Sequence, residues 1–300
     1  MNLHNDQLQR FIFDNTVVRG NHVNLTQTIE QALLHHSYPD VLKNALSELM
    51  VASALLAATL KMQGAIVLQI QGQGALKLLV VECTSLLEIR ATAKWKGDIE
   101  HVQFLDLLSQ GQFVITLDPK DGGQTYQGIV PLEGQSIAEI LQNYMHRSEQ
   151  IETRIWLSSD KNQAAGMLLQ KLPEQLDLDT DAWNRICHLA DTVTNEELLT
   201  LDATSLLHRL FHEENVRVFT AQVTQFKCSC SRQKVGNMLR MLGIEEVNSV
   251  LAEQNNIQQN IQKNIEVHCD FCNLAYEFDA IDVAQLFASD ASLIAPEKAQ

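Results

Sequence analysis

Four of the six cysteines in this 300-residue chain lie in two short pairs near its C-terminal end. Cys228 and Cys230 form a CxC pair, Cys269 and Cys272 form a CxxC pair, and 38 residues separate the two pairs. Four thiolates in two closely spaced pairs suit a tetrahedral Zn²⁺ ion, which binds cysteine sulfur at about 2.3 Å. The pattern therefore predicts one zinc ion per chain, held by these four residues.

The CxC pair also suggests redox chemistry. Residues i and i+2 of an extended backbone lie about 6.6 Å apart on one face, so both sulfurs can reach one ion. This distance is close to the long limit for disulfides, about 6.8 Å between Cα atoms, so a Cys228–Cys230 disulfide requires local bending. Strained disulfides are the labile, regulatory ones. Spacing alone leaves open an inert structural zinc site, a redox switch, a nucleic-acid zinc ribbon and thioredoxin-like chemistry. The last is disfavoured because residues 273–278 predict a strand after Cys272, where a thioredoxin motif opens a helix.

The chain is acidic, with a formal net charge of −15. Nucleic-acid binding depends on clustered Lys and Arg, so the composition argues against a general phosphate-binding surface. A local exception surrounds the first cysteine pair: Lys227, Arg232, Lys234 and Arg240. These cations can equally well flank thiolates and lower their pKa. We expect no nucleic-acid partner.

No targeting or membrane segment is visible in the sequence. The N-terminal residues are polar, whereas a signal peptide needs an apolar segment. The longest mostly apolar run, Leu49–Leu60, stops at Lys61 and is too short for a bilayer span. Paired cysteines without an export signal indicate a reducing compartment, where thiols bind metals or react. The expected location is the cytoplasm, with no membrane partner.

Hydrophobic periodicity predicts an α+β core domain over residues 1–175. Helical spacing is seen over 25–36, 100–110 and 136–147, and Asp40 is a plausible N-cap for a helix to about Met62. That helix is apolar nearly all round from Val51 to Leu60, which predicts a central position or one between sheets. A period of two predicts the strands of a largely antiparallel sheet at 65–71, 76–83, 86–95, 112–117, 125–131, 152–158 and 165–172.

Two smaller segments follow. Residues 176–225 are acidic and have a thin apolar face, so this helical layer has little burial to offset chain entropy and must dock on something. These features by themselves favour a plain linker domain over a segment that melts. A strand is expected at 217–222.

The pattern of residues 226–288 predicts a small zinc domain. It has helices at 232–242 and 244–253 and a Gln/Asn-rich loop or helix extension at 255–264. A disordered tail is expected at 289–300.

Several separate motifs resemble one family. Lys227–Arg232 (KCSCSR) and His268–Cys272 (HCDFC) look like the zinc centre of the heat-shock protein 33 family of redox-regulated holdase chaperones. The resemblance extends over roughly residues 5–287. Its other motifs are Tyr126–Val130 with Leu132–Gly134, Arg147–Gln150, Ala165–Gln170, Glu196–Leu199 and Leu210–Glu214.

The resemblance implies a specific cycle. The family holds zinc through the four cysteines when reduced and inactive. Hypochlorite, or peroxide with heat, forms two disulfides and expels zinc: Cys269–Cys272 readily, and Cys228–Cys230 once the linker unfolds. The linker domain would then be metastable, which reverses the preference stated above. The activated form is a homodimer that binds unfolding client proteins without ATP, and it is not an enzyme. The absence of a G-x-x-x-x-G-K-[ST] motif agrees with independence from ATP.

Some residues depart from the family pattern. The 38-residue spacer is longer than usual, which we attribute to the Gln/Asn-rich insertion, and Ala75 stands where we expect a proline. Cys83 and Cys187 lie outside the motif in apolar surroundings and are expected to be buried and inert. His268 abuts Cys269, but four thiolates already complete a tetrahedron.

Two other functions compete with the chaperone. One is a constitutive zinc-stapled module that binds protein or nucleic acid without redox switching. The other is a thiol oxidoreductase that uses Cys269 and Cys272.

Overall fold

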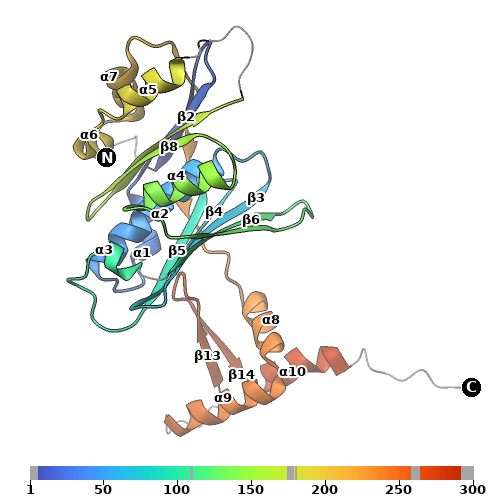
Figure 1. Cartoon of the computed structure of the whole chain (residues 1–300). Helices are drawn as coiled ribbons and strands as arrows, with labels where there is room; N and C mark the ends of the chain where they lie inside the picture. Colours follow the sequence, from blue (N-terminus) through green and yellow to red (C-terminus); the bar gives the residue numbers. More distant parts are fainter. Residues whose placement is uncertain (1–5, 109–110, 174–178, 180, 258–263, 292–300) are drawn as a thin grey trace, which may run out of the picture. The chain divides into compact units, whose positions relative to one another are not determined.

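The computed structural model describes residues 6–108, 111–173, 179, 181–257 and 264–291 (Figure 1). The chain divides into two compact units, Met1–Lys227 and Cys228–Gln300. The first unit contains two large sheets, and the second contains both cysteine pairs. The predicted α+β class with largely antiparallel sheets is confirmed.

Sheet A of the first unit has the strand order β10-β1-β2-β9-β8, and β11 also pairs with β1. All its pairings are antiparallel. Its strands are β1 (Gln7–Phe13), β2 (Val18–Leu25), β8 (Thr153–Ser159), β9 (Ala164–Lys171), β10 (Val216–Val218) and β11 (Gln222–Val223). Because β10 and β11 lie along β1, the segment shortly before the first cysteine pair is held by the N-terminal strand.

Sheet B has the order β12-β5-β4-β3-β6-β7 and is antiparallel except for the β12–β5 pair. Its strands are β3 (Gly64–Gln71), β4 (Leu76–Thr84), β5 (Glu88–Trp95), β6 (Gln112–Pro119), β7 (Tyr126–Pro131) and β12 (Gln225–Phe226). Lys227 continues β12: its N–H donates to the Ile89 carbonyl at 3.1 Å, and its ammonium lies 2.6 Å from Glu88. Lys227, the residue before Cys228, is therefore held at the edge of sheet B by a hydrogen bond and an ion pair.

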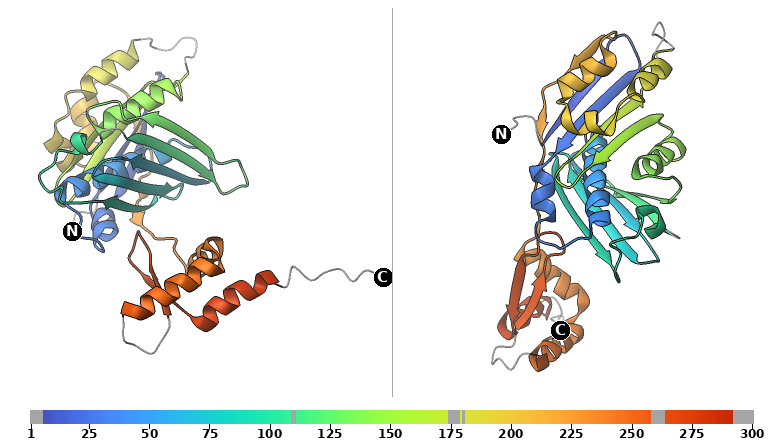
Figure 2. Two further views of the ribbon diagram at one scale, coloured as in Figure 1. Left: turned by 60° about the horizontal axis from the view of Figure 1, so that its bottom comes forward. Right: turned by 90° about the vertical axis from the view of Figure 1, so that its left-hand side faces the viewer.

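Helix α2 (Asp40–Ala57) lies between the two sheets, as its apolar sequence predicts (Figure 2). Thirteen of its eighteen residues are buried, and they pack on strands of both sheets. The helix ends before the predicted Met62. Thr59 and Leu60 donate to carbonyls only three residues back, which tightens the last turn and closes the helix.

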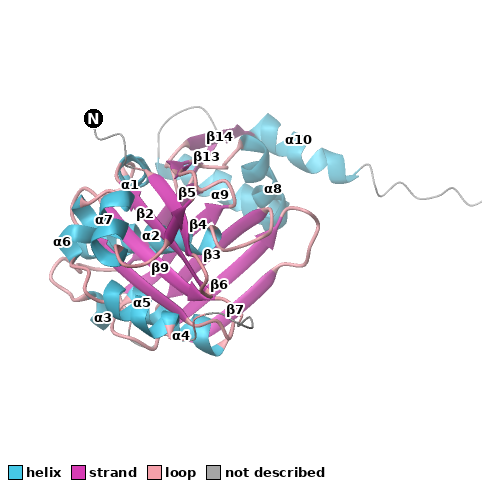
Figure 3. Ribbon diagram, turned by 90° about the horizontal axis from the view of Figure 1, so that it is seen from above, coloured by secondary structure: helices cyan, strands magenta, loops and turns pink. Residues whose placement is uncertain are grey.

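Three other helices complete the cover of this central core. They are α1 (Gln27–Leu33), α3 (Phe104–Leu107) and α4 (Ile137–Arg147), which packs on β8 and α2. The helix expected at 100–110 is thus a single turn, and residues 109–110 lie outside the described part. Figure 3 shows the strands of the unit and the helices around them from above.

Sheet A has an apolar face on each side. Alternate residues of a strand point to opposite faces, and in β9 Ala164 and Leu168 join the central core around α2. Their neighbours Ala165, Met167 and Leu169 join a second cluster on the other face. Both faces of the sheet therefore need a cover.

The second face is covered by the segment predicted as the linker. Its helices are α5 (Ala182–Ala190), α6 (Asn195–Thr200) and α7 (Ala203–Phe211), which lie across sheet A on the face away from α2 (Figure 2). Phe211 packs edge-on against Phe13, with ring centroids 4.9 Å apart. We call the apolar cluster between these helices and sheet A the linker cluster. Its buried members are Phe11, Phe13, Val18, Ala165, Met167, Leu169, Ala182, Ile186, Ala190, Leu198, Leu206, Leu207, Leu210 and Phe211.

The second unit is built from α8 (Arg232–Leu242), α9 (Ile244–Ile257), a hairpin of β13 (Asn264–His268) and β14 (Ala275–Asp279), and α10 (Ala280–Ala291). Both predicted helices are confirmed, and Gly243 between them has φ +91°, which glycine adopts readily. The Gln/Asn-rich segment begins inside α9, and its residues 258–263 lie outside the described part. Among described residues, Leu239, Val247, Ile265, Phe278 and Val283 are the buried apolar members of this unit.

Several expectations need correction. The strand expected at 217–222 is two short strands, because β10 pairs with residues 11–13 of β1 whereas β11 pairs with residues 7–8. Strands β2 and β13 and helix α10 were not predicted. The division into core, linker, zinc domain and tail stays a prediction, and residues 292–300 of the tail lie outside the described part.

Candidate metal centre

The first cysteine pair lies in the extended segment between β12 and α8. Ser231 directly follows the pair with extended backbone, and its hydroxyl accepts a hydrogen bond from Lys234 N at 3.3 Å. A serine in this conformation caps a helix N-terminus. The cap sets the residue at which the extended segment ends, immediately after Cys230.

The second pair lies in the turn of the β13–β14 hairpin. Cys269 N donates to the Leu274 carbonyl at 3.0 Å, and Asn273 N donates to the Cys269 carbonyl at 2.8 Å. Asn273 has φ +54°, in the left-handed region that asparagine tolerates better than most residues. The turn therefore brings Cys269 and Cys272 close together at one end of the hairpin.

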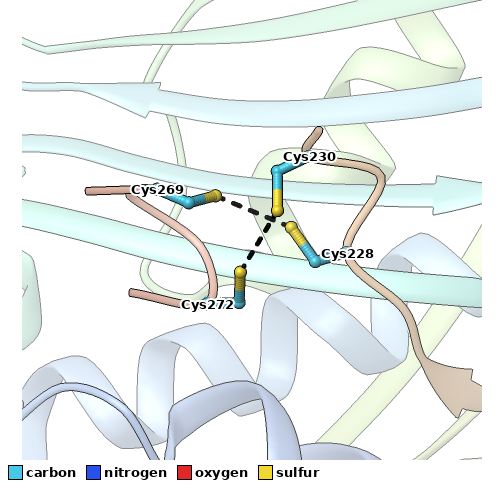
Figure 4. Close-up of side chains that lie close together, drawn as sticks. All are labelled: Cys228, Cys230, Cys269 and Cys272. Atoms are coloured by element: carbon cyan, nitrogen blue, oxygen red, sulfur yellow. Dashed lines mark hydrogen bonds between the residues drawn. The ribbon is translucent and has the colours of Figure 1, made fainter. Parts of the chain in front are cut away.

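The four sulfurs gather at one point (Figure 4). Cys228 Sγ lies 3.6 Å from Cys269 Sγ, and Cys230 Sγ lies 3.4 Å from Cys272 Sγ. All four sulfurs lie within 4.8 Å of one another. Sulfurs placed tetrahedrally at about 2.3 Å from one zinc ion would be about 3.8 Å apart. The arrangement fits four thiolates around a single metal ion.

The local electrostatics explain why a cation suits this cluster. Burial raises the pKa of Cys228 and of Cys272, which disfavours their thiolates. Burial also acts against the thiolate of Cys230, but hydrogen bonds from Tyr276 and the neighbouring thiols outweigh it and lower the pKa of Cys230. A divalent cation would stabilise all four thiolates together, because its positive charge would offset their negative charges.

Tyr276 is a contact that the sequence did not single out. Its hydroxyl donates to Cys230 Sγ at 3.1 Å, and this hydrogen bond raises the pKa of Tyr276 to about 12. A tyrosine four residues after Cys272 is a weak signal, since spacing does not tell which face of the strand it occupies. The hydroxyl orients one ligand and stabilises its negative charge, as outer partners of metal ligands do.

His268 does not join the four sulfurs. Its Nε2 lies 2.9 Å from Glu266 Oε1 and its Nδ1 lies 3.3 Å from the Asn273 carbonyl. Within the described ranges, the cluster of metal-ligating atoms consists of the four cysteines. That zinc is held without His268 stays a prediction.

The four cations near the first pair have other partners. Arg232 lies 2.6 Å from Asp282 and stacks on the Phe278 ring, while Arg240 donates to the Leu286 carbonyl at 2.7 Å. Lys234 donates to Ser229 Oγ at 3.1 Å, and Lys227 pairs with Glu88. The pKa of Cys230 is lowered by Tyr276 and the thiols, and none of these cations is among the causes.

The two remaining cysteines are buried, as predicted. Burial raises the pKa of Cys83 well above its usual range and raises the pKa of Cys187 to about 12. Both therefore stay protonated at neutral pH, and thiols are poor nucleophiles in that form.

Comparison with known proteins identifies the family. The family model described as "Hsp33 protein" matches residues 6–279 of this chain. The chain belongs to the Hsp33 family. The 33 kDa chaperonin of Methylobacillus flagellatus is 61% identical over 95% of both chains, and that of Chromobacterium violaceum is 49% identical over 98% of both. The family resemblance seen in the cysteine motifs is thus confirmed.

A solved structure shares the fold of this Hsp33 chain. The crystal structure of the 33 kDa chaperonin (heat shock protein 33 homolog) from Thermotoga maritima matches with a TM-score of 0.79, over 96% of this chain and 99% of that one. At 22% identity this likeness concerns the fold alone. The family model and the relatives place the chain in a chaperone family. In the described part of the chain, no helix is long and apolar enough to cross a membrane.

Proposed function

We propose that this protein is a redox-regulated, ATP-independent holdase chaperone. In the reduced, inactive form one Zn²⁺ ion is held by Cys228, Cys230, Cys269 and Cys272. Oxidation of these cysteines releases the ion and unfolds the C-terminal region, and the activated protein, a homodimer, binds unfolded clients. The protein acts in the cytoplasm and needs no nucleic acid, membrane or ATP, nor is it an enzyme.

The observation that carries this proposal is the position of the cysteine cluster in a small unit. The four sulfurs join the N-terminal segment of this unit to its hairpin. In the described part of the unit the buried apolar cluster has five members, and they lie in the helices and the hairpin. A thiolate set of this kind favours zinc over harder cations. In small zinc modules the metal supplies about 10–16 kcal/mol of apparent folding free energy. The ion, when bound, would act as a cross-link, and the unit depends on that cross-link.

The redox step removes the ligands themselves. In each cysteine pair two thiolates lose two electrons and form one S–S bond, while one peroxide molecule takes up these electrons and two protons from solvent and is reduced to two waters. We propose disulfides within each pair, Cys269–Cys272 first and Cys228–Cys230 after the linker has unfolded. The contacts of 3.6 and 3.4 Å between sulfurs join cysteines of different pairs, and all four sulfurs lie well beyond the S–S bond length of about 2.05 Å from these partners, so closure of either disulfide requires the cluster to rearrange.

The linker connects this chemistry to client binding. We propose a core over residues 1–175, a metastable linker over 176–225, a redox-switch domain over 226–288 and a disordered tail over 289–300. The linker helices cover an apolar face of sheet A that includes Phe11, Met167 and Leu169. Once the linker detaches, this face and the apolar side of the helices become available to unfolded polypeptide, which presents the same kind of surface.

Light scattering of a chemically denatured client tests the function. Zinc-loaded reduced protein is compared with hypochlorite-treated protein, and zinc release is recorded in the same samples. We expect suppression of aggregation only after oxidation, with about one zinc released per chain. Cys83→Ala is the matched control: it removes a buried cysteine outside both the cluster and the linker and should show the same redox dependence as the parent protein. Equal activity in both redox states would instead identify a constitutive zinc-stapled module.

A further inference from the structure

The outer edge of strand β1 in sheet A is covered by residues 215–224 of the linker, which we call the edge segment. Its two strands are short: β10 pairs with β1 over three residues and β11 over two. Strand β1 itself has seven residues and pairs with β2 at six positions. Detachment of the edge segment would therefore leave a well-supported strand with an open edge, which is a template for pairing with another chain.

Main-chain hydrogen bonds hold the edge segment along β1. They run from Asp14 N to the Asn215 carbonyl, from Phe219 N to the Arg10 carbonyl and from Thr224 N to the Asp6 carbonyl, each at 2.9 Å. The three residues on the β1 side are even-numbered, because alternate residues of an antiparallel strand direct their N–H and C=O groups to the same neighbour. The outer edge of β1 thus offers a main-chain donor and acceptor at every second residue.

Three apolar side chains of the edge segment are exposed instead of buried against the sheet. Val218 is 42% exposed, Phe219 40% and Val223 67%. Residues 216–223, VRVFTAQV, are rich in β-branched residues and contain no Pro or Gly. Exposed stretches of this composition are typical of the segments through which unfolded proteins aggregate. The edge segment therefore resembles the part of an unfolded protein that a holdase has to bind.

The opposite edge of sheet A, formed by β8, is protected in a different way. The N–H of Ile155 in β8 donates to Oε1 of Gln142 in α4 at 2.8 Å. A side chain from a covering helix that takes up an edge N–H hinders pairing with another chain at that position. Because α4 belongs to the central core and not to the linker, this protection should persist when the linker detaches. Sheet A would then open at the β1 edge.

We propose that, after oxidation, the outer edge of β1 binds an extended segment of the unfolded client, which adds a strand to sheet A in place of the edge segment. This inference rests on the proposed function, since it requires the linker to detach. In the reduced protein the edge segment occupies the client's position. Main-chain pairing accepts unrelated sequences, because every residue except proline carries the same backbone donor and acceptor.

A fluorescently labelled synthetic peptide of residues 215–224 is the probe. Anisotropy measures its binding to the full-length protein, zinc-loaded and reduced or treated with hypochlorite. N-methylation at Phe219 removes the N–H that bonds to Arg10, whereas N-methylation at Val218 removes an N–H that points away from β1. We expect binding to the oxidised protein only. N-methylation at Phe219 should weaken it about tenfold or more, and N-methylation at Val218 much less.

Arg10→Pro tests the same edge from the side of the protein. It removes an N–H on the outer edge of β1, a position at which strands tolerate proline. Arg10→Ala is the matched control, since it loses the same side chain but keeps the N–H. Oxidised Arg10→Pro should bind the peptide about tenfold or more weakly than oxidised Arg10→Ala. It should also suppress client aggregation less well. In the parent protein, excess peptide should displace a bound denatured client.

Equal loss of affinity in both N-methylated peptides would overturn the edge site, and so would equal binding to reduced and oxidised protein. The two peptides decide the question if Arg10→Pro does not fold. Oxidised parent protein that suppresses aggregation without binding the peptide, or whose client the peptide does not displace, would overturn the edge site and leave the proposed function standing. Absence of oxidation-dependent suppression in the parent protein would overturn the proposed function, and the edge site with it.

Discussion

The two faces of sheet A are covered in different ways. Helix α2 covers one face, lies between two sheets and joins a central core to which 41 described residues contribute. The linker helices cover the other face through a cluster of 14 described residues. The linker cover has sheet A on one side only, and it leads directly into the metal centre. One sheet therefore carries a larger and a smaller cover, and we propose that the smaller one, the linker cover, is removable and the other permanent.

Removal of the metal should have the largest effect, and it should affect the second unit but not helix α2. A chelator added under reducing conditions should unfold the second unit, because a small zinc module loses about 10–16 kcal/mol of apparent folding free energy with its metal. Limited trypsin digestion should then cleave α8 at Lys234 and Arg240, while Lys43 in α2 stays protected. Resistance of α8 to trypsin without metal would show that the unit folds on its apolar residues alone.

A cavity in the linker cluster should lower the stability with which the linker helices pack on sheet A, and it should leave the packing of the central core unchanged. Phe211→Ala removes a ring that is 1% exposed and packs on Phe13. The expected loss is about 3–5 kcal/mol, enough to give partial chaperone activity without oxidant. Trp183, which packs on the cluster, reports the change by fluorescence when Trp95 and Trp156 are replaced by Phe.

The matched change on the other face is Leu46→Ala in α2, a residue that is fully buried in the central core. It should lower the stability of the whole first unit by about 2–5 kcal/mol without selective release of Trp183. Equal release of Trp183 in both variants would remove the distinction between the two covers.

Acid should weaken the removable cover through His22. The pKa of His22 is lowered from its ordinary value of 6.5 to about 4 in the folded protein, mainly by burial. As the pH falls, His22 is therefore protonated in the unfolded state before it is protonated in the folded state. The free energy of unfolding is highest above pH 6.5 and decreases as the pH drops towards 4. The difference corresponds to about 3 kcal/mol. Urea titrations at pH 7 and pH 5 should show a smaller loss in His22→Gln, and an identical loss in both proteins would contradict this role.

The smallest predicted effect concerns the start of α6. Thr194 accepts a hydrogen bond from Glu197 N at 3.2 Å in a capping box. Thr194→Ala should cost about 1 kcal/mol, whereas Thr194→Ser keeps the hydroxyl and should cost much less. A modest fall in the hypochlorite dose for activation of Thr194→Ala, absent in Thr194→Ser, is the expected readout.

The features that sequence reasoning identified are those that depend on local pattern. Cysteine spacing predicted a cluster of four sulfurs that could hold a metal ion, and the all-round apolar run predicted that α2 lies between sheets. Strand β2 was missed because Asn21, His22 and Asn24 are buried in it, so the alternation of apolar and polar residues is lost. The second apolar face of sheet A was also missed, because the sequence predicted the strand β9 but did not show that both of its faces are buried.

Other features depend on contacts between distant segments. The linker's last residues pair with β1 and β5, more than 130 positions away in the chain. The contact of Tyr276 with Cys230 joins two elements of the second unit. No local periodicity encodes such contacts, and their partners appear only when the chain is folded.

Hydrogen exchange with mass spectrometry tests the central claim most directly. Exchange in α5, α6 and α7 is compared with exchange in α2, before and after hypochlorite treatment of the zinc-loaded protein. We predict that oxidation removes protection from the three linker helices by orders of magnitude and leaves α2 as slow as before. Unchanged protection in the linker helices after full zinc release, or equal loss in α2, would contradict the account of one permanent and one removable cover.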